Sequence, residues 1–137
     1  MTSDTGKATE FYKNLLGWTT EEFEIPGMET TTIFNAVGKG FGAPVPFEQQ
    51  GVPSHWISYI ACKNVDESCE QAEKLGGKVC AEPFDIPSIG RTAVITDPSG
   101  AAFHLYTSED KDQDVKVTGN ALGQICWLEL MVEDLLR

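Results

Sequence analysis

Positive charge is scarce in this sequence. Its 137 residues include only ten lysines and arginines against 21 aspartates and glutamates, which gives a net charge of −11. Nucleic-acid and acidic membrane surfaces attract basic patches, so neither partner is expected. No apolar run approaches the roughly 18 residues of a membrane span. The first residues carry neither the basic region nor the apolar core of a signal peptide, so a cytoplasmic protein is expected.

Cysteine-based and phosphate-binding motifs are lacking too. The cysteines show no Cys-x-x-Cys spacing and no secretory context, so reduced thiols are expected. None has a base close by in sequence, and no phosphate-binding glycine motif is present, which argues against a thiol nucleophile and a nucleotide site. Hydrophobic residues make up 41% of the chain, enough for one domain with its own core.

The clearest local signal is residues 91–106, RTAVITDPSGAAFHLY. Two β-branched and aromatic runs flank the turn residues 97–100, DPSG, which predicts a β-hairpin. Side chains alternate along a strand, so His104 is expected on the opposite face from Phe103 and Leu105. Such a histidine either faces a pocket as a ligand or acid-base group or is a hydrogen-bonded core residue.

Apolar spacing predicts helices over residues 8–16 and 65–75. The first is capped by Ser3 or Asp4 and ended by Gly17, and the second is capped by Asp66. Strands are predicted over residues 18–24, 31–37, 40–47 and 55–62, from residue 78, and in the hairpin. The order is therefore helix and three strands, then strand, helix and three strands.

This order contains a repeat. The second half is a complete βαβββ unit, and the first half is the same unit without its first strand. Residues 23–26, FEIP, recur as residues 84–87, FDIP, at the equivalent position. After a polar, acidic linker over residues 108–123, residues 125–132, ICWLELMV, alternate as a strand and can supply the missing one.

We therefore predict an α+β fold of two paired βαβββ modules. Module one comprises residues 1–47 with strand 125–132, and module two comprises residues 54–107. This arrangement is either a circular permutation or one unit of a longer tandem array. Strand 125–132 either folds back within its own chain or is exchanged with a second subunit, which would give a homodimer.

The motifs that combine in this chain are KATEFYKNLLGW, HWISYIACKNVDES, LGGKV and GRTAVITDPSGAAFHLY. Together they resemble the vicinal oxygen chelate superfamily, which includes glyoxalase I, bleomycin- and fosfomycin-resistance proteins, ring-cleaving dioxygenases and methylmalonyl-CoA epimerase. In particular, the chain resembles glyoxalase-like proteins with two such domains in tandem, where a WxEL strand opens each repeat, as residues 127–130 do here. The resemblance implies two modules that curl their sheets around one central cavity.

Metal-dependent members of that family carry four ligands on matching strands. The resemblance places the four positions at Trp127, at Trp56 or His55, at His104, and near Ala43 or Pro44. A divalent metal site needs three or four N, O or S donors, and only one or two of these positions can donate. We therefore predict no metal site and no cofactor.

Two residues are candidate catalytic groups, His104 and Glu129. Glu129 is expected on the cavity face of its strand, where a carboxylate is costly unless partnered. It is then a base with a raised pKa or a metal donor beside His104, or else a salt-bridged or partly hydrated residue. The candidate substrate-binding residues share the cavity-facing sides of their strands: Trp56, Ser58, Tyr106, Trp127 and Met131.

The leading functional hypothesis is a metal-independent protein of the glyoxalase and bleomycin-resistance type that binds a small apolar or aromatic molecule. One alternative is a metal-dependent lyase, isomerase or dioxygenase that uses His104 and Glu129, with or without His55 as a further ligand. A second alternative is an inactive unit of a tandem protein. Arg91 is expected to pair with Asp85 or Asp97 rather than to recognise an anion.

Overall fold

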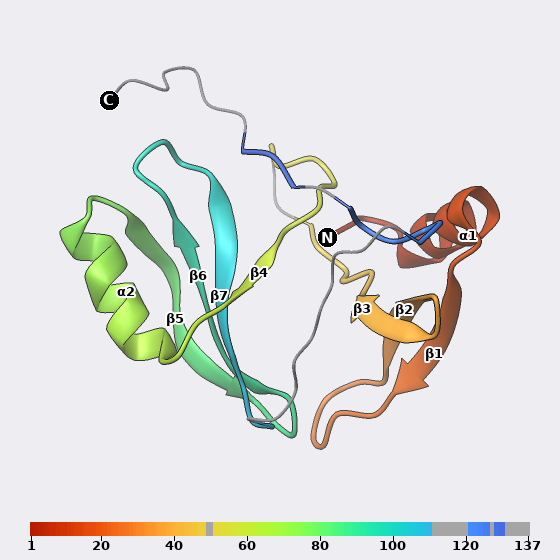
Figure 1. Cartoon of the computed structure of the whole chain (residues 1–137), viewed down its shortest axis with the longest axis horizontal. Coiled ribbons are helices and arrows are strands. Elements are labelled where there is room, and N and C mark those ends of the chain that lie inside the picture. The colour runs from red at the N-terminus through yellow and green to blue at the C-terminus, as the bar shows by residue number, and fades with distance from the viewer. Residues whose placement is uncertain (49–50, 111–120, 127, 131–137) are drawn as a thin grey trace. The chain divides into compact units, whose positions relative to one another are not determined.

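The computed structural model describes residues 1–48, 51–110, 121–126 and 128–130 (Figure 1). The chain divides into two compact units: unit 1 is Met1–Trp56 with Val115–Leu128, and unit 2 is Ile57–Asp114 with Glu129–Arg137. The fold is α+β, as predicted, with two helices and seven strands in the described part of the chain. None of its helices is long and apolar enough to span a membrane.

Unit 1 begins with helix α1, Thr5–Leu16. Its start is fixed by Asp4, whose carboxylate accepts a hydrogen bond from the Lys7 backbone N–H at 2.9 Å. Its end is fixed by Gly17, which adopts the left-handed conformation with a φ of 68°. Asp4 is one of the two caps that were predicted, and Gly17 was predicted as the end. The apolar face of α1 is mostly uncovered by the residues that the structure describes, since Leu15 is 63% exposed.

The sheet of unit 1 is antiparallel, in the order β1-β2-β3. Its strands are β1, Thr19–Phe23, β2, Thr31–Ala36, and β3, Lys39–Gly42. The prediction of a strand over residues 40–47 was too long, because β3 ends at Gly42 and Pro46 makes only an isolated bridge to Thr2. Proline lacks the N–H group that a strand ladder needs, which explains this early end.

The core of unit 1 is aromatic. Trp18, Phe34 and Ala36 are buried, and Tyr12 and Phe41 pack against them. The Trp18 indole N–H also donates to the backbone carbonyl of Gly123 at 2.7 Å. This bond attaches the described residues near the end of the chain to the core of unit 1.

Unit 2 has the βαβββ order that was predicted for the second half of the chain. Its elements are β4, Tyr59–Ala61, α2, Val65–Lys74, β5, Lys78–Ile86, β6, Gly90–Thr96, and β7, Ala102–Ser108. The strand order is β4-β7-β6-β5, with β4 parallel to β7 and the other pairs antiparallel. Helix α2 covers one face of this sheet (Figure 1).

The core of unit 2 lies between α2 and the sheet. It consists of Val65, Cys69, Ala93, Ile95 and Leu105, with Phe103 among the residues that pack against it. Leu105 therefore faces the helix, and strand alternation turns His104 to the opposite face of β7, as predicted. All four cysteines have free thiols.

Two local predictions in unit 2 were wrong. The cap of α2 is Asn64 rather than Asp66, because the Asn64 side chain accepts from the backbone N–H groups of both Asp66 and Glu67. Strand β4 has three residues, whereas a strand was predicted over residues 55–62. Residues 55–58 are not part of a strand. The pairing of β4 with β7 begins only at Tyr59, which lies opposite His104.

The C-terminal segment differs from the strand predicted over residues 125–132. Ile125 is a single bridge residue, and Cys126 and residues 128–130 lie outside any strand. Leu128, Glu129 and Leu130 are all exposed, so the expected alternation is not seen there. Trp127, Met131 and Val132 fall outside the described residues. That this segment completes module one, in its own chain or in a second subunit, stays a prediction.

Candidate functional site

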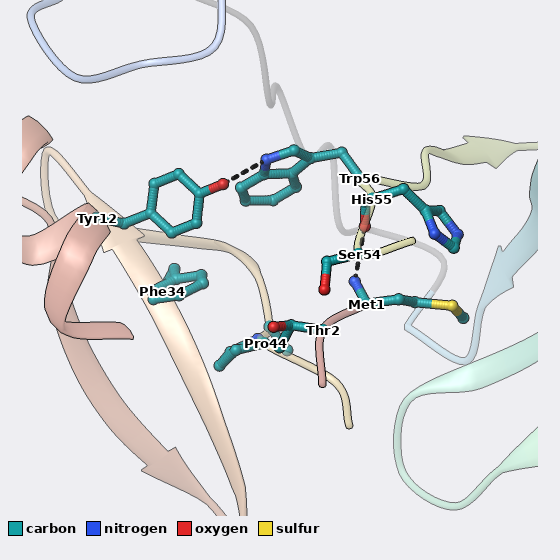
Figure 2. Close-up of a pocket in the computed structure, with 9 residues that line it drawn as sticks. Met1, Thr2, Tyr12, Phe34, Pro44, Ser54, His55 and Trp56 are labelled. Carbon is teal, nitrogen blue, oxygen red and sulfur yellow. Dashed lines mark hydrogen bonds between the residues drawn. The ribbon is translucent and has the colours of Figure 1, made fainter. Parts of the chain in front are cut away.

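A cavity in unit 1 is bounded by α1, β2 and the segments around residues 44 and 55 (Figure 2). Its volume of about 130 Å³ is close to that of cavities that take a single benzene-sized ring. The residues that line it are Met1, Thr2, Tyr12, Phe34, Ala43, Pro44, Ser54, His55 and Trp56. Trp56 was predicted as a binding residue, and Tyr12 and Phe34 were not.

Tyr12 and Trp56 form a hydrogen-bonded aromatic wall of this cavity. The Trp56 indole N–H donates to the Tyr12 hydroxyl oxygen at 2.8 Å, as the dashed line in Figure 2 shows. The two ring centroids are 5.2 Å apart in an edge-on arrangement. On its other side, Tyr12 stacks on buried Trp18 at 5.2 Å. Since the hydroxyl accepts from Trp56, its own proton is left for a third group.

The polar groups around the cavity form hydrogen bonds with backbone carbonyl groups. His55 Nδ1 donates to the Pro53 carbonyl oxygen at 2.8 Å, and its ring points away from Tyr12 and Phe34 (Figure 2). The Met1 ammonium donates to the His55 carbonyl oxygen at 2.9 Å, and its pKa is lowered by burial. The cavity is therefore walled by aromatic rings, with backbone and hydroxyl groups at its rim.

His104 lies in β7 of unit 2 and is only 4% exposed. Its Nδ1 is 3.1 Å from the hydroxyl oxygen of Thr92, and that hydroxyl lies 2.8 Å from the Leu105 carbonyl oxygen, to which it donates. Its Nε2 is buried without a hydrogen-bond partner among the described residues. Burial lowers the pKa of the imidazole, so His104 is neutral at pH 7.

Two tyrosines from neighbouring strands accompany His104. Tyr59 of β4 stacks on the imidazole, with ring centroids 4.1 Å apart and planes 16° apart. Tyr106 lies edge-on to Tyr59 and donates its hydroxyl proton to the Ile89 carbonyl at 2.9 Å. Ser58 precedes β4, and its carbonyl oxygen accepts from the His104 backbone N–H at 2.8 Å. The structure thus brings Ser58, Tyr106 and His104 together in unit 2.

Tyr59 was missed because alternation from residue 55 assigned Trp56 and Ser58 to the cavity side. The strand begins only at Tyr59, so that alternation does not extend through the segment. Trp56 belongs to unit 1, and Glu129 is exposed. Trp127 and Met131 lie outside the described residues. That these residues line one cavity with His104 stays a prediction.

The metal-ligand positions implied by the family resemblance do not fit a four-ligand site. Ala43 and Pro44 have no donor atoms in their side chains, and the Trp56 nitrogen carries a proton that it donates to Tyr12. His104 supplies one donor atom, Nε2, and the alternative His55 would add at most one more, which is fewer than the three or four donors that a metal needs. Within the described ranges, no three His, Cys, Asp or Glu side chains are grouped so that they could hold a metal ion.

Arg91 is a structural residue. Its guanidinium contacts Asp66 of α2 at 2.7 Å and Asp85 of β5 at 2.9 Å. The hydrogen bonds from Arg91 lower the pKa of Asp66. The predicted pairing with Asp85 is confirmed, whereas the carboxylate of Asp97 instead accepts from backbone N–H groups within the hairpin turn.

A complete βαβββ unit, with a buried histidine on the face of its last strand opposite α2, places the protein in the glyoxalase-like class of folds. The chain belongs to the Glyoxalase/Bleomycin resistance protein/Dioxygenase superfamily, whose family model matches residues 1–105.

Curated relatives are considerably longer than this chain. The anthracycline biosynthesis protein DauV of Streptomyces sp. (strain C5) is 32% identical over 96% of this chain and 52% of its own length. The putative glyoxylase CFP32 of Mycobacterium bovis is 37% identical over 77% of this chain and 40% of its own length. The chain thus spans about half the length, or less, of the curated relatives that it matches.

Among solved structures, a protein from Staphylococcus aureus matches 80% of this chain and 91% of its own with a TM-score of 0.47 and 20% identity. A glyoxalase/bleomycin resistance protein from Streptomyces sp. CB03234 matches 77% of this chain and 92% of its own with a TM-score of 0.32 and 23% identity.

Proposed function

We propose that this protein binds a small apolar or aromatic molecule in the cavity of unit 1, and that it does so without a metal ion. The observation that carries the proposal is the Tyr12–Trp56 pair, which is hydrogen-bonded at 2.8 Å and lines the cavity together with Phe34. Flat aromatic walls with one free hydroxyl proton suit a ring that carries a hydrogen-bond acceptor.

The size of the cavity limits what it can enclose. A volume of about 130 Å³ takes one ring, so a larger ligand would place one ring there and extend beyond it. Trp56 is 51% exposed, which leaves part of its indole face available for such contact. Members of the superfamily bind small molecules, which supports the same function for this chain.

Two relatives are named as anthracycline biosynthesis proteins, and two as putative glyoxylases. Anthracyclines and their biosynthetic precursors are therefore the first ligands to screen. The matches cover 52% and 40% of the two relatives described above, so this choice of ligand is part of the proposal.

The test is a ligand screen by thermal shift, followed by titration of each hit with tryptophan fluorescence as the signal. A ligand at a hundred times its dissociation constant is expected to stabilise the folded protein by about 2.7 kcal/mol. Trp56→Leu is expected to abolish the shift. Phe84→Leu is the matched control, since Phe84 is also partly exposed but lies outside the cavity.

Equal binding by wild type and Trp56→Leu would refute this cavity as the site. Absence of any stabilising ligand would favour the alternative of an inactive unit of a tandem protein. Homodimer formation by exchange of strand 125–132 is a separate part of the proposal. Sedimentation of the purified chain distinguishes an exchanged dimer from a chain that folds back on itself.

The second candidate is a metal-dependent lyase, isomerase or dioxygenase, and the unpartnered Nε2 of His104 is the observation in its favour. Metal analysis of protein produced with Zn, Ni, Fe and Mn separates the two functions. Stoichiometric metal that is lost in His104→Ala would overturn the metal-independent proposal. Metal content that is the same in both proteins would count against His104 as a ligand.

A further inference from the structure

His104 is an unusual buried group in unit 2. Nearly all buried side-chain nitrogens and oxygens in folded proteins have a hydrogen-bond partner. The ring is 4% exposed, yet its Nε2 has none among the residues that the structure describes. The other ring nitrogen, Nδ1, is hydrogen-bonded to the Thr92 hydroxyl at 3.1 Å. The unpartnered Nε2 therefore belongs to a side chain whose orientation is fixed.

The hydrogen bonds of Thr92 determine which imidazole nitrogen carries the proton. A hydroxyl has one proton to donate, and the Thr92 hydroxyl lies 2.8 Å from the Leu105 carbonyl, which can only accept. The same oxygen is 3.1 Å from His104 Nδ1 and therefore accepts from it. In a neutral imidazole only one nitrogen is protonated, so Nε2 is left with a bare lone pair.

Tyr59 fixes the plane of the imidazole. Its ring stacks on His104 with centroids 4.1 Å apart, and Tyr59 and His104 are register partners in the parallel β4·β7 pair. The lone pair of Nε2 lies in the ring plane, so stacking and the Thr92 bond together fix its direction. Tyr59 is 51% exposed, so its ring can move away from the imidazole without opening the core beneath α2.

We propose that Thr92 is a positioning residue that holds His104 in the Nδ1–H tautomer, so that Nε2 accepts a hydrogen bond from a ligand. The ligand class is a neutral molecule with a hydroxyl, phenol or N–H donor. Ionised carboxylates and simple ketones have acceptor oxygens but no donor, so they cannot hydrogen-bond to the Nε2 lone pair and are disfavoured there. The ligand part of this inference rests on the proposed small-molecule binding, whereas the tautomer is a property of the unliganded protein.

The tautomer is tested by ¹⁵N NMR of protein labelled at histidine, at a pH above 7. The chain has two histidines, and His55→Gln assigns the signals of His104. Wild type and Thr92→Ser, which keeps the hydroxyl, are expected to show a protonated Nδ1 and a bare Nε2. Thr92→Val removes the hydroxyl and is expected to populate the Nε2–H tautomer. A protonated Nε2 in wild type, or no change in Thr92→Val, overturns the proposal.

The acceptor role is tested with phenol and anisole, which share one ring but differ in having a hydroxyl donor. Phenol is expected to move the Nε2 resonance of His104, and anisole is not. Thr92→Val should weaken phenol binding roughly fivefold to tenfold, and Thr92→Ser should restore it. Equal responses to the two probes, or none to either, overturn the acceptor role.

These outcomes are distinct from failure of the proposed cavity in unit 1. A ligand that stabilises wild type but not Trp56→Leu, and that leaves the Nε2 resonance unchanged, overturns the acceptor role and leaves the cavity proposal standing. If phenol shifts the Nε2 resonance but no ligand distinguishes wild type from Trp56→Leu, the role of His104 is supported and the cavity proposal loses its support.

Discussion

Lowering the pH from 7 to 5 is expected to destabilise unit 2 through His104. The imidazole is buried, and protonation would place a charge and a second N–H where Nε2 has no partner among the described residues. Burial therefore lowers the pKa of His104 in the folded state from its ordinary value of 6.5. The unfolded chain keeps the ordinary pKa and binds the proton first.

The sign and size of the effect follow from this difference. Above pH 6.5 both states are neutral, and the contribution of His104 to stability is fully present. As the pH falls from 6.5 towards the lower folded-state pKa, the unfolded state binds more protons, so the free energy of unfolding decreases. The slope approaches about 1.4 kcal/mol per pH unit between the two pKa values and vanishes below the lower one.

The assay is urea unfolding at half-unit steps from pH 5 to pH 8, followed by the methyl NMR signals of Ile95 and Leu105 in the core of unit 2. Neither Trp18 nor Trp56, the two tryptophans that the structure describes, lies within the core of unit 2, so tryptophan fluorescence is not used to follow that core. His104→Phe keeps a ring for stacking on Tyr59 but does not titrate, and His55 is present in both proteins. An equal pH dependence in wild type and His104→Phe would refute the reasoning.

Three further predictions concern stability and are measured by circular dichroism during urea unfolding. Asn64→Ala removes the cap of α2 and should cost about 1 kcal/mol, and an unchanged midpoint would contradict the capping role. Gly90→Ala should cost about 3 kcal/mol or more, since a Cβ there would collide with the Thr107 carbonyl oxygen, and full stability would contradict that clash. Leu105→Ala should cost about 2 to 5 kcal/mol, whereas Leu122→Ala, at a residue that is 99% exposed, should stay within about 0.5 kcal/mol. Equal losses in these two variants would contradict the assigned core.

Sequence alone predicted the features that depend on neighbouring residues. Asp4 and Gly17 lie at the two ends of α1. The hairpin turn around Asp97 lies where the proline and glycine in the sequence predicted it. The face of His104 followed from strand alternation within one regular strand. In each case the information lies within a few positions, so tertiary packing has little opportunity to change the result.

The cavity wall could not be predicted in the same way. Tyr12 was assigned only to the apolar face of a helix, and its bond to Trp56 joins residues 44 positions apart. The hydroxyl of Thr92 and its role towards His104 likewise depend on strand register, which fixes which side chains lie side by side. The cap of α2 was misplaced by two residues because Asn64 and Asp66 are both good capping residues, and only backbone geometry separates them.

The uncovered apolar side chains of α1 have a consequence for how the protein behaves at high concentration. Phe11 and Leu15 are 57% and 63% exposed, and exposed apolar surface of this kind promotes self-association. A net charge of −11 opposes it, because like-charged molecules repel before these side chains can meet. Near the isoelectric point of about 4.4, or in concentrated salt, that protection disappears. The negative charge of this chain thus keeps its molecules apart in solution, and acidification should cause aggregation through loss of that charge as well as through the loss of stability expected from His104.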